Sequence, residues 1–237
     1  MQAVIMAGGS GIRLRPFTYA IPKPLLPLGD LTILEYTIRS LSQAGFNEIF
    51  LLTSYQHEKF QQCREYENKY QIKINIDFEE ERMGTAGGLI LLKNRLDDNF
   101  LTLNGDILVR MSFRDMFDYH LSNQADMTIG ITKFSFTVPY GVVELGRNHE
   151  LINLTEKAGY SFLVSSGIYI LNSSILGLME HTDYLDMPEL IAMARKKHKK
   201  LNTFDVGERW LDTGQLDDYE RAVGKIEEWS QADSGEA

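Results

Sequence analysis

The sequence predicts an α/β domain whose central sheet is mainly parallel, with helices on both faces and antiparallel strands added in its second half. Two patterns indicate this fold. Up to residue 106, short apolar runs alternate with segments of helical spacing, which is typical of right-handed βαβ units. After residue 106 the chain becomes strand-rich. The length of 237 residues suits one domain over 1–229, with a frayed, small and acidic tail over 230–237.

The first-half elements follow from their apolar spacing and from the glycines that bound them. Buried strands are expected over residues 3–7, 48–52 and 100–103. The alternation of Ile72, Ile74, Ile76 and Phe78 predicts a strand near an edge of the sheet. Helices are expected over 33–44, 57–70 and 85–96, and Gly45 stands where the first of them needs a C-terminal cap.

The second half is expected to begin with a helix over residues 112–121. Four strands then follow, over residues 127–134, 141–145, 151–155 and 162–171. Three helices complete the domain, over residues 173–179, 187–198 and 215–229.

Composition excludes several function classes. The chain has 24 Lys and Arg against 33 Asp and Glu, a net charge of −9, which argues against nucleic-acid binding. Cys63 is the single cysteine, so neither an intrachain disulfide nor a cysteine-rich zinc site is expected, and the five histidines, read as surface or helix residues, lack metal-ligand spacing. No signal peptide or membrane span is expected, and the cytoplasm is the expected location.

A glycine-rich segment directly after the first strand is the first candidate site. Gly8, Gly9 and Gly11 would let the backbone approach a ligand and turn its N–H groups toward phosphate oxygens, and Arg13 follows at once. The spacing is neither G-x-G-x-x-G nor that of a Walker A loop. A glycine-rich turn without a ligand is the alternative.

Two further segments place lysines where a phosphate could be bound. Pro22 and Pro24 hold Lys23 on a stiff, extended backbone, where its ammonium could face a phosphate or only solvent. Glu156 and Lys157 follow a predicted strand, where they could bind sugar hydroxyls and a second phosphate, or be exposed charge.

Two aspartates are candidates for a metal site. Asp106 ends a buried strand, at the edge where open α/β sheets bind ligands. Mg²⁺ takes one or two carboxylates together with phosphate oxygens, so Asp106 and Asp212 could hold it if they meet in space. The alternatives are an ordinary Asn-Gly-Asp turn and a helix cap.

These segments together resemble the sugar-1-phosphate nucleotidyltransferase family. The family's opening signature, Gly-Gly-x-Gly-x-Arg-Leu-x-Pro followed by Pro-Lys-Pro, stands here at residues 8–16 and 22–24. Further family motifs follow in the family's order, and the resemblance extends to about residue 225. They are Gly84-Thr-Ala-Gly87, Asn104-Gly-Asp106, Pro139-Tyr-Gly141, Glu156-Lys157, Ser166-Gly-Ile-Tyr169 and Trp210-Leu-Asp-Thr-Gly214.

The resemblance implies a Rossmann-like α/β fold and a reaction in which a nucleoside triphosphate and a sugar 1-phosphate give a nucleoside-diphosphate sugar and pyrophosphate. It implies Arg13, Lys23 and Asp106 as catalytic residues, and Asp106 and Asp212 as ligands of Mg²⁺. The nucleotide-binding residues that it implies are Ala7, Gly8, Gly9, Gly11, Glu80, Gly84 and Thr85. The implied sugar-phosphate-binding residues are Gly141, Glu156, Lys157 and Ser165. The sequence leaves homo-oligomerisation open.

The base and the sugar are less well determined. The segment Glu79-Glu-Glu-Arg-Met-Gly-Thr-Ala-Gly87 resembles guanylyltransferases of the mannose-1-phosphate type, and carboxylates can accept hydrogen bonds from guanine, so GTP is favoured. Solvated charge at the end of a strand is the alternative for the three acids. Uridylyl, thymidylyl and cytidylyl transfer are alternatives. Ser165 and Ser166 depart from the family's usual Asn-Ala-Gly or Asn-Ser-Gly, which predicts an unusual sugar. A non-catalytic nucleotide-sugar sensor is a rival, whereas the missing G-x-G-x-x-G and Asp-x-Asp motifs disfavour an NAD-dependent oxidoreductase and a glycosyltransferase.

Overall fold

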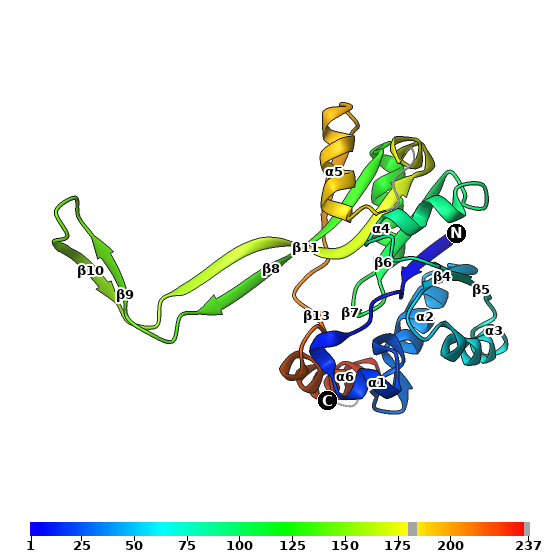
Figure 1. Cartoon of the computed structure of the whole chain (residues 1–237), viewed down its shortest axis with the longest axis horizontal. Helices are drawn as coiled ribbons and strands as arrows, with labels where there is room; N and C mark the ends of the chain where they lie inside the picture. Colours follow the sequence, from blue (N-terminus) through cyan, green and yellow to red (C-terminus); the bar gives the residue numbers. More distant parts are fainter. Residues whose placement is uncertain (180–183, 235–237) are drawn as a thin grey trace.

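The computed structural model describes residues 1–179 and 184–234 and is organised around a mixed seven-stranded sheet (Figure 1). The strand order is β12-β8-β11-β6-β1-β4-β5, and β11 runs antiparallel to both of its neighbours while the other pairs are parallel. The strands are β1 Gln2–Met6, β4 Glu48–Thr53, β5 Lys73–Phe78, β6 Asn99–Asn104, β8 Met127–Thr137, β11 Gly159–Asn172 and β12 Leu201–Asp205. The expected mainly parallel sheet with antiparallel additions is confirmed, and β5 lies at an edge as its alternation predicts.

Three short strand pairs lie outside this sheet. They are β2 Pro27–Leu28 with β3 Leu31–Thr32, β7 Ile107–Val109 with β13 Trp210–Asp212, and β9 Val142–Leu145 with β10 Leu151–Thr155. The sequence predicts β9 and β10 but not β2, β3, β7, β12 or β13. Segments of only three residues beside turns, such as Ile107–Val109 and Trp210–Asp212, carry no periodicity, so only their partners in space make β7 and β13 strands.

Helices close to those expected flank the sheet. The α-helices are α1 Phe17–Ala20, α2 Ile33–Gln43, α3 Glu65–Tyr70, α4 Phe113–Ser122, α5 Met187–Lys196 and α6 Leu216–Ser234. The 3₁₀ segments are η1 Ile12–Leu14, η2 Lys23–Leu25, η3 His57–Arg64, η4 Gly87–Leu92 and η5 Ser173–Leu178. None of the helices within the described residues is long and apolar enough to cross a lipid bilayer. Helix α6 passes the expected end at residue 229, while His181 and residues 235–237 lie outside the described residues.

Two expected helices are shorter than the sequence predicts. The segment 57–70 divides into η3 and α3, and only η4 forms within 85–96. In the second case the N–H groups of Ala86 and Gly87 both donate to the carbonyl of Leu185. Since consecutive glycines are poor helix formers, this tertiary bonding prevails over a regular first turn.

Side chains of the central strands alternate between two helical layers. Ala3 and Ile5 of β1 pack in the core cluster formed with α2, η3 and α4. Val4, between them, packs in the cluster formed with η4, η5 and α5. This period of two puts apolar residues on both faces of the sheet, as expected for buried parallel strands. A third cluster lies under α6 and includes Leu14, Leu28 and Trp229.

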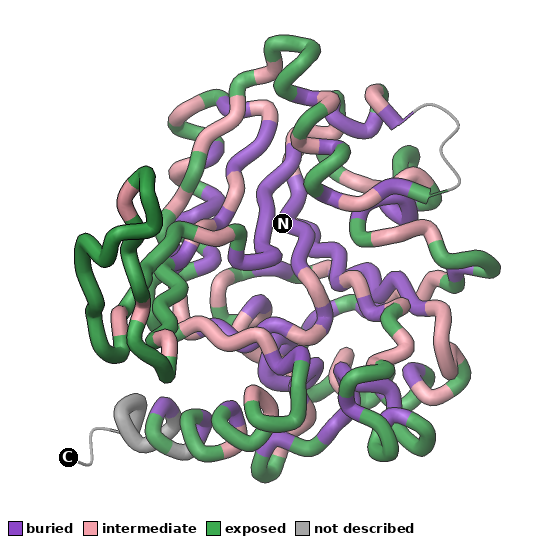
Figure 2. The backbone as a smooth tube through the Cα atoms, turned by 60° about the vertical axis from the view of Figure 1, so that its left-hand side comes forward, coloured by how far each residue is buried: buried purple, intermediate pink, exposed green. Residues whose placement is uncertain are grey.

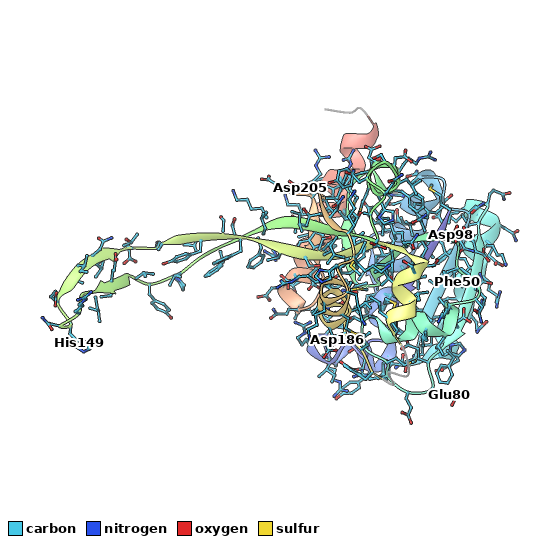
Figure 3. The ribbon with its side chains drawn as sticks, turned by 90° about the horizontal axis from the view of Figure 1, so that it is seen from above. Phe50, Glu80, Asp98, His149, Asp186 and Asp205 are labelled. Atoms are coloured by element: carbon cyan, nitrogen blue, oxygen red, sulfur yellow. The ribbon has the colours of Figure 1, made fainter. Side chains whose placement is uncertain are left out.

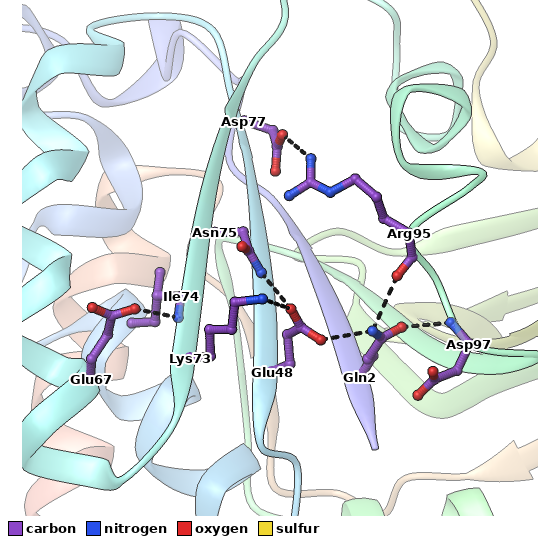
Figure 4. Close-up of polar contacts among 9 residues, drawn as sticks. All are labelled: Gln2, Glu48, Glu67, Lys73, Ile74, Asn75, Asp77, Arg95 and Asp97. Carbon is purple, nitrogen blue, oxygen red and sulfur yellow. Dashed lines mark hydrogen bonds and ion pairs between the residues drawn. The ribbon is translucent and has the colours of Figure 1, made fainter.

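A polar network ties the amino-terminal ends of β1, β4 and β5 together (Figure 4). Glu48 accepts hydrogen bonds from Gln2, Lys73 and Asn75, at 2.8, 2.7 and 2.9 Å, and Gln2 accepts one from the backbone N–H of Asp97. Although partial burial raises the pKa of Glu48, these bonds lower it to about 2. The network therefore fixes the end of the sheet opposite to the strands' carboxyl ends.

A long projection leaves the body through β8 and β11 (Figures 1 and 2). The pairing of β12 with β8 ends at Ile131, and the pairing of β6 with β11 ends at Ile168. Beyond these positions β8 and β11 continue as a two-stranded ribbon that carries the β9–β10 hairpin, with His149 near its far end (Figure 3). We call residues 132–165 the arm.

Candidate active site

A pocket of about 390 Å³ opens at the carboxyl edge of the parallel strands. Its wall includes Met6 at the end of β1, Glu79 just after β5 and Asn104 at the end of β6. The carboxyl ends of parallel strands are where open α/β sheets bind ligands. The volume lies within the range of small-molecule sites, so the pocket is the candidate active site.

The glycine loop forms one wall of the pocket, as the sequence predicts. Ala7, Gly8, Gly9 and Gly11 all line it. Gly11 has a φ of +58°, and a Cβ there would lie 2.7 Å from Cγ2 of Thr18, so a glycine is required. A Cβ at Gly9 would meet nothing within 4 Å, which leaves this part of the backbone open to a ligand.

Four charged side chains converge beside the loop. The buried Lys23 forms an ion pair with Oδ2 of Asp106, and its Nζ lies 3.9 Å from Oδ1 of Asp212. Arg13 lines the same pocket, and its Nη2 is 3.3 Å from the position of a Cβ on Gly214. The expected extended backbone at Lys23 is wrong, because Lys23–Leu25 form the 3₁₀ segment η2. The alternative of a solvated Lys23 is wrong as well, because its side chain is buried beside the two carboxylates.

The β7–β13 pair brings the two aspartates together across more than 100 residues of chain. Asp212 pairs with Ile107, the residue after Asp106. Thr213 fixes the register, because its backbone N–H and its hydroxyl both donate to the carbonyl of Asp106, at 3.2 and 2.8 Å. Burial and the charge of Asp106 raise the pKa of Asp212, while Lys23 and Arg13 oppose that rise.

The two carboxylates fit a magnesium ion. Oδ1 of Asp212 is buried and accepts no hydrogen bond from any described residue, so it is free to coordinate a cation. Within residues 1–179 and 184–234, no group of three or more His, Cys, Asp or Glu could hold a metal. Two carboxylates are the number that Mg²⁺ takes from a protein when phosphates supply further ligands.

Glu79, and not Glu80, is the acidic residue in the pocket wall. Glu80 is exposed and its side chain points away from the body (Figure 3). Glu79 is only 4% exposed, with Oε2 beside Gly8 and Oε1 beside Gly88, and burial raises its pKa to about 7. No described residue donates a hydrogen bond to Oε1. The sequence marks the run of three acids but cannot say which one turns inward.

Gly84 and Thr85 line the pocket as predicted, and they also hold the loop in place. Gly84 has a φ of +80°, and a Cβ there would lie 2.5 Å from the carbonyl oxygen of Leu185. Thr85 donates to Oδ1 of Asp186 through its backbone N–H and its hydroxyl, at 2.9 and 3.1 Å. Its hydroxyl also accepts from the N–H of Met187. The backbone N–H and the hydroxyl of Thr85 are therefore both bonded to residues at the start of α5.

The predicted sugar-phosphate residues are not brought to the pocket of their own chain. Gly141, Glu156 and Lys157 lie where the hairpin joins the ribbon of the arm, and Ser165 lies at its base; none of these four lines the pocket. Gly141 and Glu156 are neighbours, since a Cβ at Gly141 would lie 3.2 Å from Oε2 of Glu156. These four residues thus stand on the arm, away from Arg13 in the pocket.

Several other residues that line the pocket were not predicted from the sequence, among them Arg82, Asn104, Tyr184 and Asp186. Asp186 also caps α5, where its backbone N–H donates to Glu189. Asn104 was detectable from the Asn-Gly-Asp motif, but no sequence pattern places Tyr184 and Asp186, because α5 reaches the pocket only through the tertiary fold.

Comparison with known proteins identifies the family. The model of the Nucleotidyl transferase family matches residues 2–228 of the chain. The chain belongs to this family. Among curated relatives, mannose-1-phosphate guanyltransferases from Schizosaccharomyces pombe and Yarrowia lipolytica are 34% and 32% identical over 92% of this chain. This nucleotidyl transferase chain spans 62% of the length of those relatives.

Solved structures confirm the fold of this nucleotidyl transferase. HddC from Yersinia pseudotuberculosis superposes with a TM-score of 0.74 and 24% identity, covering 95% of this chain and 99% of that one. A putative glucose-1-phosphate thymidylyltransferase from Bacillus anthracis gives a TM-score of 0.76 and 20% identity, covering 95% and 94%. The expected Rossmann-like, mainly parallel α/β architecture is therefore confirmed.

Proposed function

We propose that this chain transfers a nucleotidyl group from a nucleoside triphosphate, with GTP favoured, to a sugar 1-phosphate in the cytoplasm. One observation carries the proposal: a single pocket joins a glycine loop, Arg13, Lys23 and Asp106, and Oδ1 of Asp212 lies 3.9 Å from Nζ of Lys23. Family membership and the guanyltransferase names of the curated relatives support it.

The reaction requires two anions to meet. A sugar phosphate of charge about −2 approaches a triphosphate of charge about −4, and catalysis of such transfers is mostly positioning and charge stabilisation. A phosphate oxygen of the sugar forms a bond to the α-phosphorus while the bond from that phosphorus to the bridging oxygen breaks, and pyrophosphate leaves. The sugar phosphate is itself the nucleophile, so no covalent enzyme intermediate is needed.

The chain's own residues supply the positioning. Backbone N–H groups around Gly8, Gly9 and Gly11 would hold the triphosphate, and Arg13 would stabilise the charge on the leaving pyrophosphate. Lys23 is held between two carboxylates and buried, so its ammonium loses little conformational freedom when it turns to a phosphate oxygen. The net charge of −9 does not oppose this, because net charge describes the whole surface and not the pocket.

Asp106 and Asp212 are the residues that would hold Mg²⁺. When bound, the ion supplies neutralisation of phosphate oxygens. Oδ1 of Asp212 is buried and accepts no hydrogen bond from a described residue, which supports this assignment, as does the charge of Asp106 that raises the pKa of Asp212.

Glu79 supports a guanine base. Guanine presents N1–H and N2–H₂ donors on one edge, and an ionised carboxylate can accept from both. Glu79 is the acid of the 79–81 run that lines the pocket, beside Gly8 of the nucleotide loop. Binding such donors would lower its raised pKa, because hydrogen bonds to the charged form favour that form.

A pyrophosphate-release screen with Mg²⁺ tests the proposal. Four triphosphates are combined with hexose, amino-hexose and heptose 1-phosphates, and the nucleotide sugar is confirmed by mass spectrometry. We expect GTP to give the highest kcat/KM among the triphosphates. Because serines stand at 165 and 166, we expect an unusual sugar 1-phosphate to be preferred. If the protein binds nucleotide but releases pyrophosphate from no combination of triphosphate and sugar 1-phosphate, it is instead a non-catalytic nucleotide-sugar sensor.

A further inference from the structure

The arm exposes an aromatic face to solvent. Phe136 stands opposite Tyr160, and Phe134 stands opposite Phe162, so all four side chains point to one side of the ribbon. The ring centroids of Phe136 lie 5.8 Å from Tyr160 and 6.2 Å from Phe162, in stacked arrangements. No other described part of the chain covers them, and each is at least 40% exposed.

The β9–β10 hairpin extends this apolar surface. Eleven large hydrophobic residues of the arm are 40–74% exposed, including Tyr140, Leu151 and Leu163 (Figure 2). Because a large side chain offers 150–250 Å², their exposed area is on the order of 1,000 Å² per arm. Phe162 and Leu163 are consecutive in β11 and point to opposite faces, so this area is divided between the two faces of the arm. A partner that encloses the arm could therefore bury the roughly 800 Å² that each side of a stable interface buries.

A second apolar surface borders the pocket. Ile12, Phe17, Tyr19 and Ile21, on the segment after the glycine loop, are 38–61% exposed, and Ile12 lines the pocket itself. Exposed apolar residues therefore occur on the arm and also on the rim of the pocket. The arm's residues do not line the pocket of their own chain. Neither surface covers the other within one chain.

The charge of the arm favours contact with another copy. Residues 132–165 contain three Lys and Arg and three Glu, so the arm is neutral although the chain carries −9. Two arms can approach each other without net repulsion. A ribbon of two strands is also marginally stable alone in water, which makes a covering surface necessary.

The arm is held in a direction that does not reach its own pocket. Its ladder runs without interruption from the Thr137–Gly159 pair to the Ile131–Ser165 pair. Six residue steps at about 3.4 Å place the hairpin roughly 20 Å beyond the end of β12 pairing.

The base of the arm is fixed by the body. The pairing of β8 and β11 shifts register between Ser165 and Tyr169, and the residues at this shift contact the body. Trp210 donates to the carbonyl of Ser166, and a Cβ at Gly167 would lie 2.9 Å from Nδ2 of Asn104. The two sides of the register shift are thus held against β13 and the end of β6.

We propose that two copies of this chain exchange arms, so that Glu156 and Lys157 of one copy complete the pocket of the other. The exchange is reciprocal about a two-fold axis, with each aromatic arm covering the apolar rim of the second copy. The assignment of Glu156 and Lys157 to the sugar phosphate rests on the proposed function; the exchange itself rests on the arm and the rim.

A heterodimer of two defective chains tests the exchange through activity. One chain carries Arg13→Ala in its pocket and the other Lys157→Ala on its arm, and two affinity tags isolate the mixed dimer. Each homodimer should lose kcat/KM for the sugar 1-phosphate by roughly 100-fold. The mixed dimer should recover about half of the wild-type value, because one pocket receives an intact arm. Recovery no greater than in the parents shows that each arm serves its own pocket.

A disulfide tests the exchange without activity. Cys63 is fully buried and its pKa is raised to about 12, so it will not compete with introduced thiols. A chain with Ile12→Cys on the rim and Ala158→Cys on the arm should oxidise to a covalent dimer at twice the mass of one chain. A band at single-chain mass, with or without an internal disulfide, contradicts the exchange. Inactivity of the wild type towards every substrate would refute the proposed function and leave this result valid.

A surface variant separates the arm's apolar face from other exposed residues. Phe136→Ser with Phe162→Ser should convert the dimer to monomer in sedimentation velocity. Leu121→Ser, at a residue of α4 that is equally exposed, is the matched control and should leave the dimer intact. A monomeric wild type, or a double variant that stays dimeric, counts against the arm as the interface.

Discussion

Replacing Glu79 by Gln should remove a pH dependence of folding stability. Glu79 is buried in the pocket wall, and burial raises its pKa from 4.5 to about 7. Its folded pKa is thus above its unfolded value, so its stabilising contribution is complete below pH 4.5 and is lost as pH rises through 7. A difference of 2.5 pKa units corresponds to about 3 kcal/mol of unfolding free energy.

Urea unfolding of the ligand-free protein at pH 5, 6, 7 and 8 measures this loss. The wild type should lose up to about 3 kcal/mol across the series relative to Glu79→Gln, since all other titrating groups are shared. Glu80→Gln removes the same charge from an exposed neighbour and should follow the wild type. Parallel pH profiles for wild type and Glu79→Gln would refute the buried carboxyl as the titrating group.

The same variant tests base selection. If Glu79 accepts from guanine, Glu79→Gln should lower kcat/KM for GTP by roughly 10- to 100-fold, the effect of one or two polar contacts. The preference over other triphosphates should shrink accordingly, while Glu80→Gln should keep it. An unchanged GTP preference would place the base elsewhere in the pocket.

Three further outcomes are expected. Asp106→Asn should lower kcat on the order of 100-fold or more while circular dichroism and melting temperature stay unchanged; wild-type turnover at saturating Mg²⁺ would rule out the metal assignment. Burial lowers the pKa of His120 to about 4, so stability should fall by up to about 3 kcal/mol as pH drops from 6.5 to 4, and urea unfolding of His120→Gln should lack this slope. Gly84→Ala should cost roughly 1–3 kcal/mol, because its φ is +80° and its Cβ would meet a backbone carbonyl, whereas Gly177→Ala, in open space, should melt like the wild type.

Local chemistry made much of the fold predictable. The alternation of apolar runs and helical segments identifies β1, β4, β6 and α2. The spacing of buried residues in a strand or a helix is set by its own backbone geometry, so it can be read from the sequence of that segment alone. Predictions failed where partners decide the conformation. The chain after Thr85 forms only η4 because Leu185, a hundred residues away, takes its N–H groups.

The candidate site divides in the same way. The spacing of Gly8, Gly9, Gly11 and Arg13 is local, and the sequence places them correctly on one loop. The sequence also marks Asp106 and Asp212 as a possible pair, but their meeting depends on β7 and β13, whose short runs have no independent tendency to form strands.

The sequence by itself determined the family's motifs, the α/β order of the first half and the residue types of the candidate phosphate-binding pocket, because these depend on neighbours in the chain. Only the tertiary structure decided that Glu79 rather than Glu80 faces the pocket, that Lys23 is buried between two carboxylates, and that the residues predicted to bind the sugar phosphate stand on an arm. The direction in which a strand leaves a sheet, and the side on which an acid at its end is buried, are set by packing between distant segments, which residue spacing does not encode.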